Sequence, residues 1–245
     1  MNRVPLPASA PSPAACLLLF TKPARPGRVK TRLVGSLSAE QAAALHEAFL
    51  GDLCERLAGR RGFDLRLAWA VDAGEAPPAT HLPAVVQRGS DLGERLFGAL
   101  AEAAAGHPLV AAVGSDHPTL SAERVEEAFA ALAAGADIAL GPAHDGGYYL
   151  IALRREALSP RLFDGVPWST GEVLAHTLSR CGELGLATAL LPAEADVDTP
   201  ADLARLAAAL LEADAPSCPR TRALLQEWGM LATGLVAPEP AAALL

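Results

Sequence analysis

Short apolar runs alternate with alanine-rich amphipathic segments along most of this chain, and this alternation constrains its fold more than any other feature. The runs at 14–20, 65–71 and 109–113 have the length and composition of strands buried on both faces. After the first run, apolar residues such as Leu45 and Phe49 recur at helical spacing. Strands that alternate with helices build a mostly parallel sheet covered by helices on both faces. The sequence therefore predicts an α/β fold, a three-layer α/β/α sandwich around a mostly parallel, Rossmann-like sheet. Shorter apolar runs of the same kind lie at 85–87, 137–140, 147–153 and 187–191.

Helix starts are marked by the side chains that cap them. Ser38 precedes Gln41 by three residues, the spacing of a capping box, and Asp91 precedes Glu94 by the same distance. Thr199 is followed by a proline at the first helical position, which is a strong start signal. These positions predict three helix starts that agree with the alternating pattern.

The chain divides into three parts by composition. Residues 1–13 are rich in Pro, Ala and Ser, and we expect them to form a disordered lead-in. Residues 14–212 carry the alternating pattern and are expected to form a single domain. Residues 213–245 are a C-terminal extension with one predicted helix at 221–231, and assembly into a homodimer through that helix is open.

The charge and the cysteines exclude several classes of protein. A formal charge of −8 argues against a general nucleic-acid binder, which needs a basic face for phosphates. No run approaches the roughly 18 apolar residues that cross a bilayer, and residues 1–19 lack the flanks of a signal peptide. The four cysteines lie far apart without metal-ligand spacing, which favours a reduced, cytoplasmic compartment. We expect a soluble protein that binds neither nucleic acid nor membranes.

Positive charge is concentrated in one loop, residues 22–32, directly after the first predicted strand. Nucleotide-binding sheets hold phosphate at this position, and Gly27 lets the backbone approach a ligand closely. The loop lacks the Gly-Lys-Ser/Thr ending of a P-loop, so a Walker-type ATPase is disfavoured. The alternative is a solvated basic loop without a ligand. The candidate phosphate ligands in this loop are Lys22, Arg25, Arg28, Lys30 and Arg32.

Two aspartates with similar surroundings stand far apart in the chain. Asp116 follows the apolar run 109–113, and Asp198 directly precedes the helix that Thr199 caps. A carboxylate that follows a buried strand lies at the carboxyl edge of the sheet, where open α/β sheets bind ligands. Each aspartate alone is explained equally well as a turn residue. Together with the basic loop they predict a Mg²⁺ site, because Mg²⁺ takes one or two carboxylates plus phosphate oxygens, and Asp196 is an alternative ligand.

A third group of candidates falls on the segment His144 to Tyr149 and on two shorter segments. The paired glycines indicate a tight turn or a strand pressed against a ligand, and a plain hairpin turn is the alternative. Consecutive tyrosines point to opposite faces of a strand, so we expect at most one of them to face the ligand. Gln87 can read a base, and Asp91 can contact the nucleotide, although helix capping explains its position as well. The candidates on the acceptor side are Asp145, Gly146, Gly147, Tyr148, Trp168 and Thr170.

Other catalytic patterns are missing from the sequence. The six histidines form no metal-like set, and His46, His81, His107 and His176 are predicted at ordinary surface or helix positions. No Gly-x-Ser-x-Gly motif or Cys/His pairing is present, so covalent hydrolase chemistry has no support.

From about Leu17 to Leu206, the chain resembles the GT-A-fold nucleotide-diphospho-sugar transferase superfamily. Within it, the chain is similar to the DUF2064 family, the "transferase 1, rSAM/selenodomain-associated" group usually labelled glycosyltransferase, which is related to phospholactate guanylyltransferases. His117 stands where the family more often has a small residue. The matching segments are GRVKTRL at 27–33, GSDLGERL at 89–96, GSDHPTL at 114–120, GPAHDGGYYLIAL at 141–153, Trp168 to Thr170, and DVDTPADL at 196–203.

This resemblance implies a GT-A-like, nucleotide-binding transferase domain at 14–212. It also implies that the basic loop holds a triphosphate, that the aspartate at Asp116 holds Mg²⁺ (or Mn²⁺), and that Asp198 completes the metal site. The implied donor is a nucleoside tri- or diphosphate and the implied acceptor a small molecule.

Two reactions fit these residues. In nucleotidyl transfer, a small phosphorylated or carboxylated acceptor attacks the α-phosphorus, and the leaving pyrophosphate needs cations. Lys22, Lys30 and Arg32 can supply them, with Lys30 and Asp116 as the expected catalytic residues. A sugar nucleotide has no γ-phosphate, so nucleotidyl transfer is slightly favoured over a glycosyltransferase. A catalytically inactive nucleotide-binding module is a further alternative.

Overall fold

The computed structural model describes residues 14–212 and 216–231. The predicted lead-in at 1–13 and parts of the C-terminal extension lie outside the described residues. The strands are β1 (Ala15–Thr21), β2 (Asp64–Trp69), β3 (Ala84–Val86), β4 (Leu109–Gly114), β5 (Ile138–Pro142), β6 (Tyr148–Arg154) and β7 (Thr188–Leu190). They form one sheet in the order β3-β2-β1-β4-β6-β5-β7. Only β6 runs antiparallel to its neighbours β4 and β5 within this described sheet.

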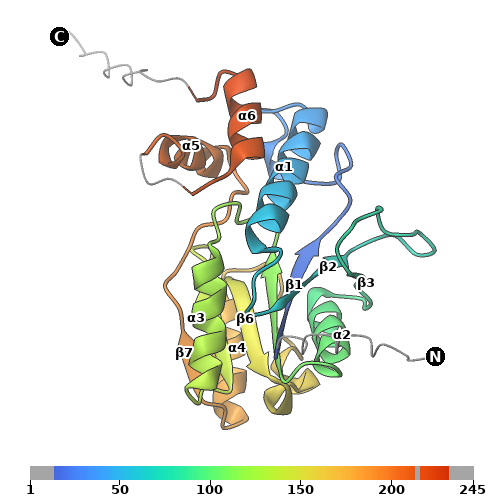
Figure 1. Ribbon diagram of the computed structural model, residues 1–245, viewed down its shortest axis with the longest axis vertical. Helices are drawn as coiled ribbons and strands as arrows, with labels where there is room; N and C mark the ends of the chain where they lie inside the picture. The colour runs from blue at the N-terminus through green and yellow to red at the C-terminus, as the bar shows by residue number, and fades with distance from the viewer. Residues whose placement is uncertain (1–13, 213–215, 232–245) are drawn as a thin grey trace, which may run out of the picture.

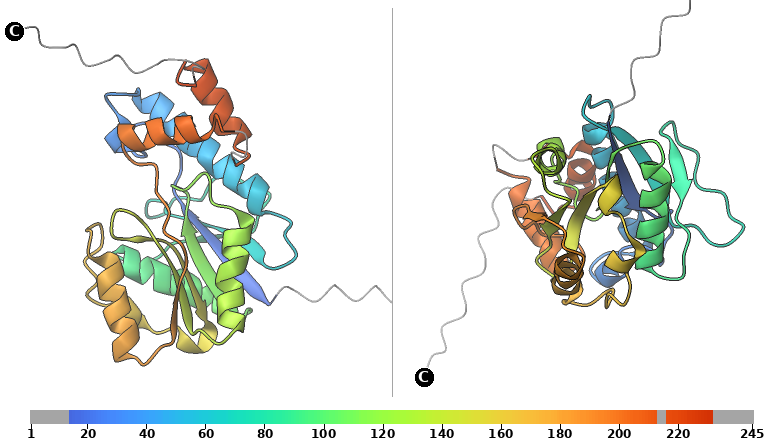
Figure 2. Two further views of the ribbon diagram at one scale, coloured as in Figure 1. Left: turned by 90° about the vertical axis from the view of Figure 1, so that its left-hand side faces the viewer. Right: turned by 90° about the horizontal axis from the view of Figure 1, so that it is seen from below.

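Helices cover both faces of the sheet (Figures 1 and 2). Side chains of α1 and α3 pack into the core on one face, and those of α2 and α4 pack into the core on the other. The predicted α/β class and its three layers are confirmed. The helices are α1 (Ala39–Leu57), α2 (Leu92–Ala104), α3 (Ala122–Ala133), α4 (Val173–Glu183), α5 (Pro200–Ala209) and α6 (Pro219–Glu227), with short 3-10 turns at η1 (Thr31–Leu33), η2 (Arg155–Ala157) and η3 (Pro160–Leu162).

The central strand β1 shows why the strands read as continuous apolar runs. Leu17 and Leu19 are buried in the core beneath α1 and α3, whereas Cys16 and Leu18 are buried in the opposite core. Successive side chains of a strand point to opposite faces, so a strand covered on both sides needs apolar residues at every position.

The helix caps follow the predicted pattern with one exception. Ser38 forms a complete capping box with Gln41, and Thr199 caps α5 with proline at its first position. At α2, the Asp91 side chain accepts a hydrogen bond from the Glu94 backbone at 2.8 Å. The Glu94 carboxylate, however, accepts from the backbone of the preceding Ser90 at 2.7 Å, so the second half of the expected box is absent there.

The strand order places a topological switch point between β1 and β4. After β1 the chain adds β2 and β3 on one side, and it then returns to add β4 on the other side of β1. The loops that leave β1 and β4 therefore diverge at the same carboxyl edge and open a crevice between them. The basic loop follows β1, and Asp116 follows β4.

A third, smaller core lies at this end of the molecule. Apolar side chains of α1, α5 and α6 pack there with Leu33 of η1 and with Val197. Figure 1 shows α6 alongside α1, above the sheet, within the stretch where a C-terminal helix is expected. Among the described residues, no helix is both long enough and apolar enough to cross a membrane.

Candidate active site

Lys30 brings the two distant aspartates together. Its backbone is left-handed, with φ 46°, at the start of η1, and its side chain is only 2% exposed. Its ammonium lies 2.5 Å from Asp116 Oδ1 and 3.1 Å from Asp198 Oδ1, and it donates to the Val197 carbonyl at 2.6 Å. The ring of Phe49 lies 5.4 Å away. An ammonium has three donors, so each N–H of Lys30 already has a partner within the protein.

This arrangement changes the expected role of Lys30. The sequence predicts a phosphate ligand, whereas the structure has its ammonium between two carboxylates. A phosphate reaches this ammonium only by replacing one of its protein partners. Arg32 remains nearer to solvent, with its side chain 69% exposed and its guanidinium 3.7 Å from Asp198.

The carboxylates of the site influence one another. Burial alone would raise the pKa of Asp116, but the charge and hydrogen bond of Lys30 lower that pKa below its ordinary value. The pKa of Asp196 is raised, first by burial and then by the negative charges of Asp145 and Asp198. Negative charge at this edge is therefore only partly balanced by protein cations.

These residues fit a hard divalent cation. Their donors are carboxylate oxygens, which Mg²⁺ and Mn²⁺ prefer, and four aspartates, Asp116, Asp145, Asp196 and Asp198, line the same cavity. In the described part of the chain, no three His, Cys, Asp or Glu residues form a ready-made metal cluster. Asp116 and Asp198 would therefore hold the cation together with phosphate oxygens and water, as is usual for Mg²⁺.

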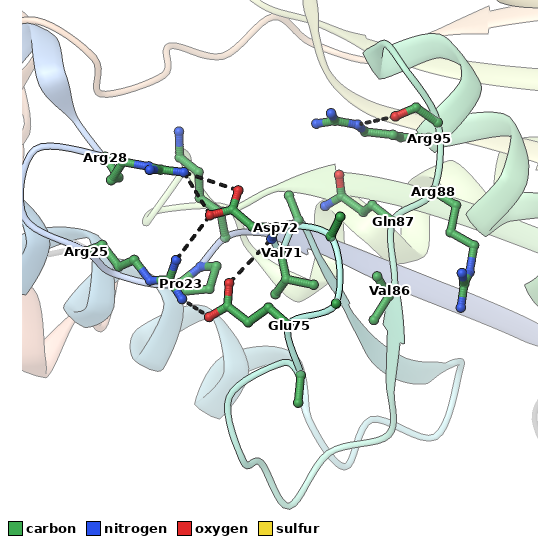
Figure 3. Close-up of a pocket in the computed structure, with 16 residues that line it drawn as sticks. Pro23, Arg25, Arg28, Val71, Asp72, Glu75, Val86, Gln87, Arg88 and Arg95 are labelled. Carbon is green, nitrogen blue, oxygen red and sulfur yellow. Dashed lines mark hydrogen bonds and ion pairs between the residues drawn. The ribbon is translucent and has the colours of Figure 1, made fainter.

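A basic cavity of about 880 Å³ opens beside this cluster, between the loop after β1 and the segments that follow β2 and β3. Figure 3 shows its labelled side chains. Gly27 lies in the loop with φ 72°, and nothing lies within 4 Å of the point where its Cβ would be. The basic residues that line the cavity are Lys22, Arg25, Arg28, Arg88 and Arg95.

Two acidic side chains form ion pairs with arginines of the basic loop. Asp72 lies 3.0 Å from the guanidinium of Arg28 and 3.5 Å from that of Arg25, and Glu75 pairs with Arg25 (Figure 3). We call Asp72 and Glu75 the acidic clasp. It was missed in the sequence, although Asp72 stands shortly after a strand, as Asp116 does. Phosphates that use these arginines must compete with the clasp.

The side chains of Gln87 and Asp91 form hydrogen bonds with the backbone of the protein itself. The Gln87 amide donates to the carbonyls of Ala68 at 2.8 Å and Thr21 at 3.3 Å, which ties three strand ends together, although the residue also lines the basic cavity. Asp91 caps α2 and lines a separate cavity of about 130 Å³ with Phe163.

An acidic cavity of about 550 Å³ lies on the other side of Lys30. Asp145, Gly147, Tyr148, Trp168 and Thr170 all line it, as the sequence predicts for an acceptor side. Its acidic residues are Asp116, Asp145, Asp196 and Asp198, opposed by Arg32.

Several of the residues predicted on the acceptor side also stabilise the local backbone. Asp145 accepts a hydrogen bond from the Gly147 backbone at 2.9 Å, which makes it a turn former as well as a cavity residue. Gly146 has φ 89° and presses on Gly171, whose carbonyl oxygen would lie 2.1 Å from an added Cβ. Thr170 donates to the Pro167 carbonyl at 2.7 Å. Tyr148 and Tyr149 pack into the cores on opposite faces of the sheet and both line this cavity, and that at most one of them faces a ligand stays a prediction.

Both tyrosines line the rim because the cavity lies at the end of β6 rather than over one face of the sheet. Tyr148 meets Trp168 edge-on, with ring centres 6.4 Å apart. Tyr149 packs against His117, with ring centres 5.3 Å apart. His117 is therefore buried against an aromatic ring.

Two histidines lie in other places than the sequence predicts. His46 is buried and lines the small cavity around Lys30, where its Nε2 lies 3.1 Å from the Lys22 carbonyl. His107 is buried too, with its Nε2 3.0 Å from Asp64. The missed signal for His46 was its spacing from Phe49, which puts it on the buried side of α1.

Three cavities adjoin one another through shared lining residues, and we call this row of cavities the path. A small cavity of about 170 Å³, which we call the lysine cavity, lies between the basic and acidic cavities. Lys22 lines both the basic and the lysine cavity. Arg32, Asp116 and Asp198 line both the lysine and the acidic cavity. A ligand that spans the path passes the Asp116–Lys30–Asp198 cluster.

Comparisons with known proteins agree with this architecture. Residues 53–170 match the family model described as an uncharacterized protein conserved in bacteria, DUF2064. A crystal structure from Desulfovibrio desulfuricans G20, provisionally named a nucleotide-diphospho-sugar transferase, is 34% identical, with a TM-score of 0.81 over 89% of this chain and 96% of the other. A cytidylyltransferase from Leptospira borgpetersenii shares the fold at 12% identity, with a TM-score of 0.52 over 92% of this chain and 100% of the other. No curated protein matches the chain.

The fold and the identity over most of the chain define a transferase with the architecture of the nucleotide-diphospho-sugar transferases. The chain belongs to the DUF2064 family. The resemblance stated from the sequence segments is thereby confirmed.

Proposed function

We propose that this protein is a Mg²⁺-dependent nucleotidyltransferase. The donor is a nucleoside triphosphate, and the acceptor is a small phosphorylated or carboxylated molecule. The observation that carries the proposal is the row of adjoining cavities that leads from the basic cavity, past Lys30, Asp116 and Asp198, to the acidic cavity. A polyanionic donor fits the basic end, which leaves the acidic cavity for the acceptor.

Each group has a role in this proposal. Lys22 and Arg32 face the path and bind the phosphates of the donor, and the loop arginines join them once the acidic clasp releases them. Lys30 holds Asp116 and Asp198 close to each other, and these two carboxylates would hold the cation. Bound there, the cation neutralises charge that builds on the phosphates during transfer. The acceptor oxygen then attacks the α-phosphorus, and pyrophosphate leaves toward the basic side.

The acidic cavity limits the acceptor. A phosphorylated or carboxylated acceptor meets four aspartates there and one arginine, Arg32. Its negative charge has to be offset by the cation at Asp116 and Asp198. Binding of such an acceptor is therefore expected to require the cation.

Glycosyl transfer from a sugar nucleotide is the second candidate. The observation in its favour is the acidic clasp, because Asp72 and Glu75 already neutralise Arg25 and Arg28. With those three ion pairs intact, fewer free cations remain for a third phosphate.

A thermal-shift panel distinguishes the candidates. Nucleoside triphosphates, diphosphates and sugar nucleotides are each added with and without Mg²⁺, because a ligand that binds only the folded state raises the melting temperature. Stabilisation by one triphosphate above its diphosphate, dependent on Mg²⁺, is the expected result. A preference for a sugar nucleotide would move the assignment to glycosyl transfer, and silence across the panel would contradict both.

Asp116→Asn tests the metal role directly. The substitution replaces a charged ligand by a neutral one, so we expect Mg²⁺-dependent stabilisation by the triphosphate to disappear and turnover to fall by about 100-fold or more. Asp164→Asn makes the same change at an exposed position outside the path and is the control. Wild-type Mg²⁺ dependence in Asp116→Asn would remove Asp116 from the metal site.

A further inference from the structure

The loop that carries Asp116 is held from outside the site by one arginine. Arg56, near the end of α1, donates through Nη1 to the Pro118 carbonyl at 2.6 Å and to the Leu120 carbonyl at 2.9 Å. Its other terminal nitrogen donates to the Ser217 carbonyl and lies 3.1 Å from the sulfur of Cys218. One planar guanidinium therefore joins the Asp116 loop to the segment that leads into α6.

The loop depends on such external contacts. The Asp116 side chain is 46% exposed and faces the cavities, so packing in the core does not fix it. The Pro118 carbonyl also accepts a hydrogen bond from the thiol of Cys218 at 3.2 Å. Within the loop, Leu120 donates to the His117 carbonyl at 3.0 Å. Other contacts hold the two ends of the loop, since Ser115 donates to the Phe20 carbonyl at 3.1 Å, the Asp116 carbonyl accepts from Val197 at 3.1 Å, and Leu120 is buried in the core. The hydrogen bonds of Arg56 are the ones that join the turn to α1.

The segment that leads into α6, which Arg56 also contacts, is itself held in place by α1. Asp52, fully buried one turn earlier on α1, accepts hydrogen bonds from the backbone of Arg220 at 3.0 Å and of Thr221 at 2.9 Å. It also accepts from the Thr221 hydroxyl at 2.7 Å. A carboxylate at a helix N-terminus satisfies donors that the helix leaves unpaired. Helix α6 is therefore anchored to α1 independently of Arg56, and Arg56 lies between two anchored partners.

We propose that Arg56 is a positioning residue that couples the C-terminal helix α6 to Asp116. It sets the orientation of the Asp116 carboxylate toward Lys30 and toward the cation. The guanidinium is suited to this task because its donors have a fixed planar geometry, whereas a lysine offers a single flexible point charge. The inference rests on the proposed role of Asp116 as a cation ligand, and it extends the site to residues more than 100 positions away in sequence.

The test compares Arg56→Met, Arg56→Lys and the control Arg60→Met. Arg60 is the next arginine in the chain and only forms an exposed ion pair with Glu123, at 3.7 Å, and a bond to the Arg56 carbonyl. Two quantities are measured: amide hydrogen exchange of peptides covering 115–121, and the affinity for Mn²⁺ with the triphosphate that stabilises the wild type best. Hydrogen exchange reports local opening independently of turnover.

In Arg56→Met we expect exchange at 115–121 to rise about tenfold and the Mn²⁺ dissociation constant to rise about tenfold, each equivalent to ~1.4 kcal/mol. Exchange in α2 should stay unchanged. Arg56→Lys, which keeps one donor to the loop, should restore part of both losses. Arg60→Met should match the wild type.

Three results would overturn the proposal: a folded Arg56→Met with wild-type exchange and Mn²⁺ affinity, equal losses in Arg60→Met, or no rescue by lysine. If Arg56→Met does not fold, Cys218→Ala replaces it, because that variant removes the thiol donor to Pro118 and the sulfur beside Arg56 but keeps the bonds of the guanidinium to the loop. A smaller rise in exchange at 115–121 is then expected, and its absence would contradict the inference. A wild type that binds no Mn²⁺ refutes the proposed function, while the exchange data still decide whether Arg56 holds the loop.

Discussion

Lys30 carries a positive charge into a nearly water-free position, and its partners make this tolerable. Its ammonium has two carboxylates and one carbonyl around it and lies over the ring of Phe49, 5.4 Å from the ring centre. A buried charge without such partners costs several kcal/mol. The same contacts keep Asp116 and Asp198 close to each other without a bound cation.

Replacing Lys30 by methionine tests how much these contacts contribute to stability. Without the ammonium, Asp116 and Asp198 repel each other, and we expect the free energy of unfolding at pH 7 in EDTA to fall by about 2 kcal/mol. This value lies below that of a fully buried pair because the carboxylates are 46% and 34% exposed. Urea unfolding measures the loss, and Lys22→Met, at the other lysine of the chain, is the matched control.

The loss of stability in Lys30→Met should become smaller as the pH falls. Lys30 lowers the folded-state pKa of Asp116, so its stabilisation is complete above the unfolded value of about 3.9 and is lost as the pH falls through the lower folded value. The gap between wild type and Lys30→Met should therefore be constant from pH 7 to about pH 5 and shrink below about pH 4. A gap that widens on acidification would contradict the assigned pairing.

At the scale of elements, two loops meet across the basic cavity. The loop after β1 supplies Arg25 and Arg28, and the loop between β2 and β3 supplies the acidic clasp (Figure 3). Both partners of the Arg28–Asp72 pair are 63% exposed, so the contact contributes little to stability. Its effect is expected on ligand binding instead.

Removing the clasp should strengthen donor binding. In Asp72→Asn with Glu75→Gln the arginines no longer have competing carboxylates, and we expect the dissociation constant of the preferred triphosphate to fall about threefold to fivefold. The melting temperature without ligand should hardly change. Titration calorimetry measures the affinity, and Glu183→Gln, at the exposed pair with Arg180, is the control. Weaker binding would mean that the clasp itself contacts the nucleotide.

The start of α5 is a second element with a bearing on the site. Asp202 accepts from the backbone of Asp198 at 3.1 Å and of Thr199 at 2.7 Å, which fixes the peptide that carries Asp198. The pKa of Asp202 would be raised by burial but is lowered by its hydrogen bonds, first that of the Thr199 side chain. The cap therefore links helix initiation to the placement of a candidate metal ligand.

Thr199→Ala and Ser38→Ala make a matched pair. Both remove the side-chain cap of a complete capping box, so each should lower the free energy of unfolding by about 1 kcal/mol. Only Thr199→Ala should also reduce Mg²⁺-dependent stabilisation by the triphosphate, because only that cap adjoins Asp198. Urea unfolding and the thermal-shift assay measure the two effects. Equal effects of both variants on ligand stabilisation would argue against the link.

At the scale of the whole molecule, three site segments rest on one small core. Leu33 follows Lys30, Val197 precedes Asp198, and both are buried with side chains of α1, α5 and α6. The Asp116 loop joins the same region through Arg56. The C-terminal helix thus contributes to the surface on which the site is built.

Asp52→Ala should measure how much the anchoring of α6 to α1 contributes to the stability of the protein. The substitution leaves donors at the start of α6 without a partner, and we expect the free energy of unfolding to fall by about 3 kcal/mol. Glu55→Ala removes an exposed partner of the same Arg220 and should cost less than about 0.5 kcal/mol. Similar losses in urea unfolding for both variants would show that α6 is not anchored through Asp52.

Local patterns in the sequence were sufficient for the fold. The alternation of apolar runs and helical segments, together with caps such as Ser38 and Thr199, depends on residues a few positions apart. The same reasoning placed the basic loop after β1 and Asp116 after β4, because the end of a parallel strand marks the edge where ligands bind.

Only the tertiary structure decided how those residues meet. Lys30 and Asp198 are 168 positions apart, Arg28 and Asp72 are 44 apart, and Arg56 and Ser217 are 161 apart. Contacts over such separations leave no periodic trace in one sequence, since they depend on which loops the strand order brings together. The sequence alone therefore determined an α/β fold and predicted which edge of its sheet carries the basic loop and Asp116. The strand order, which brings distant loops to that edge, determined that Lys30 pairs with carboxylates and that the acidic clasp pairs with the loop arginines.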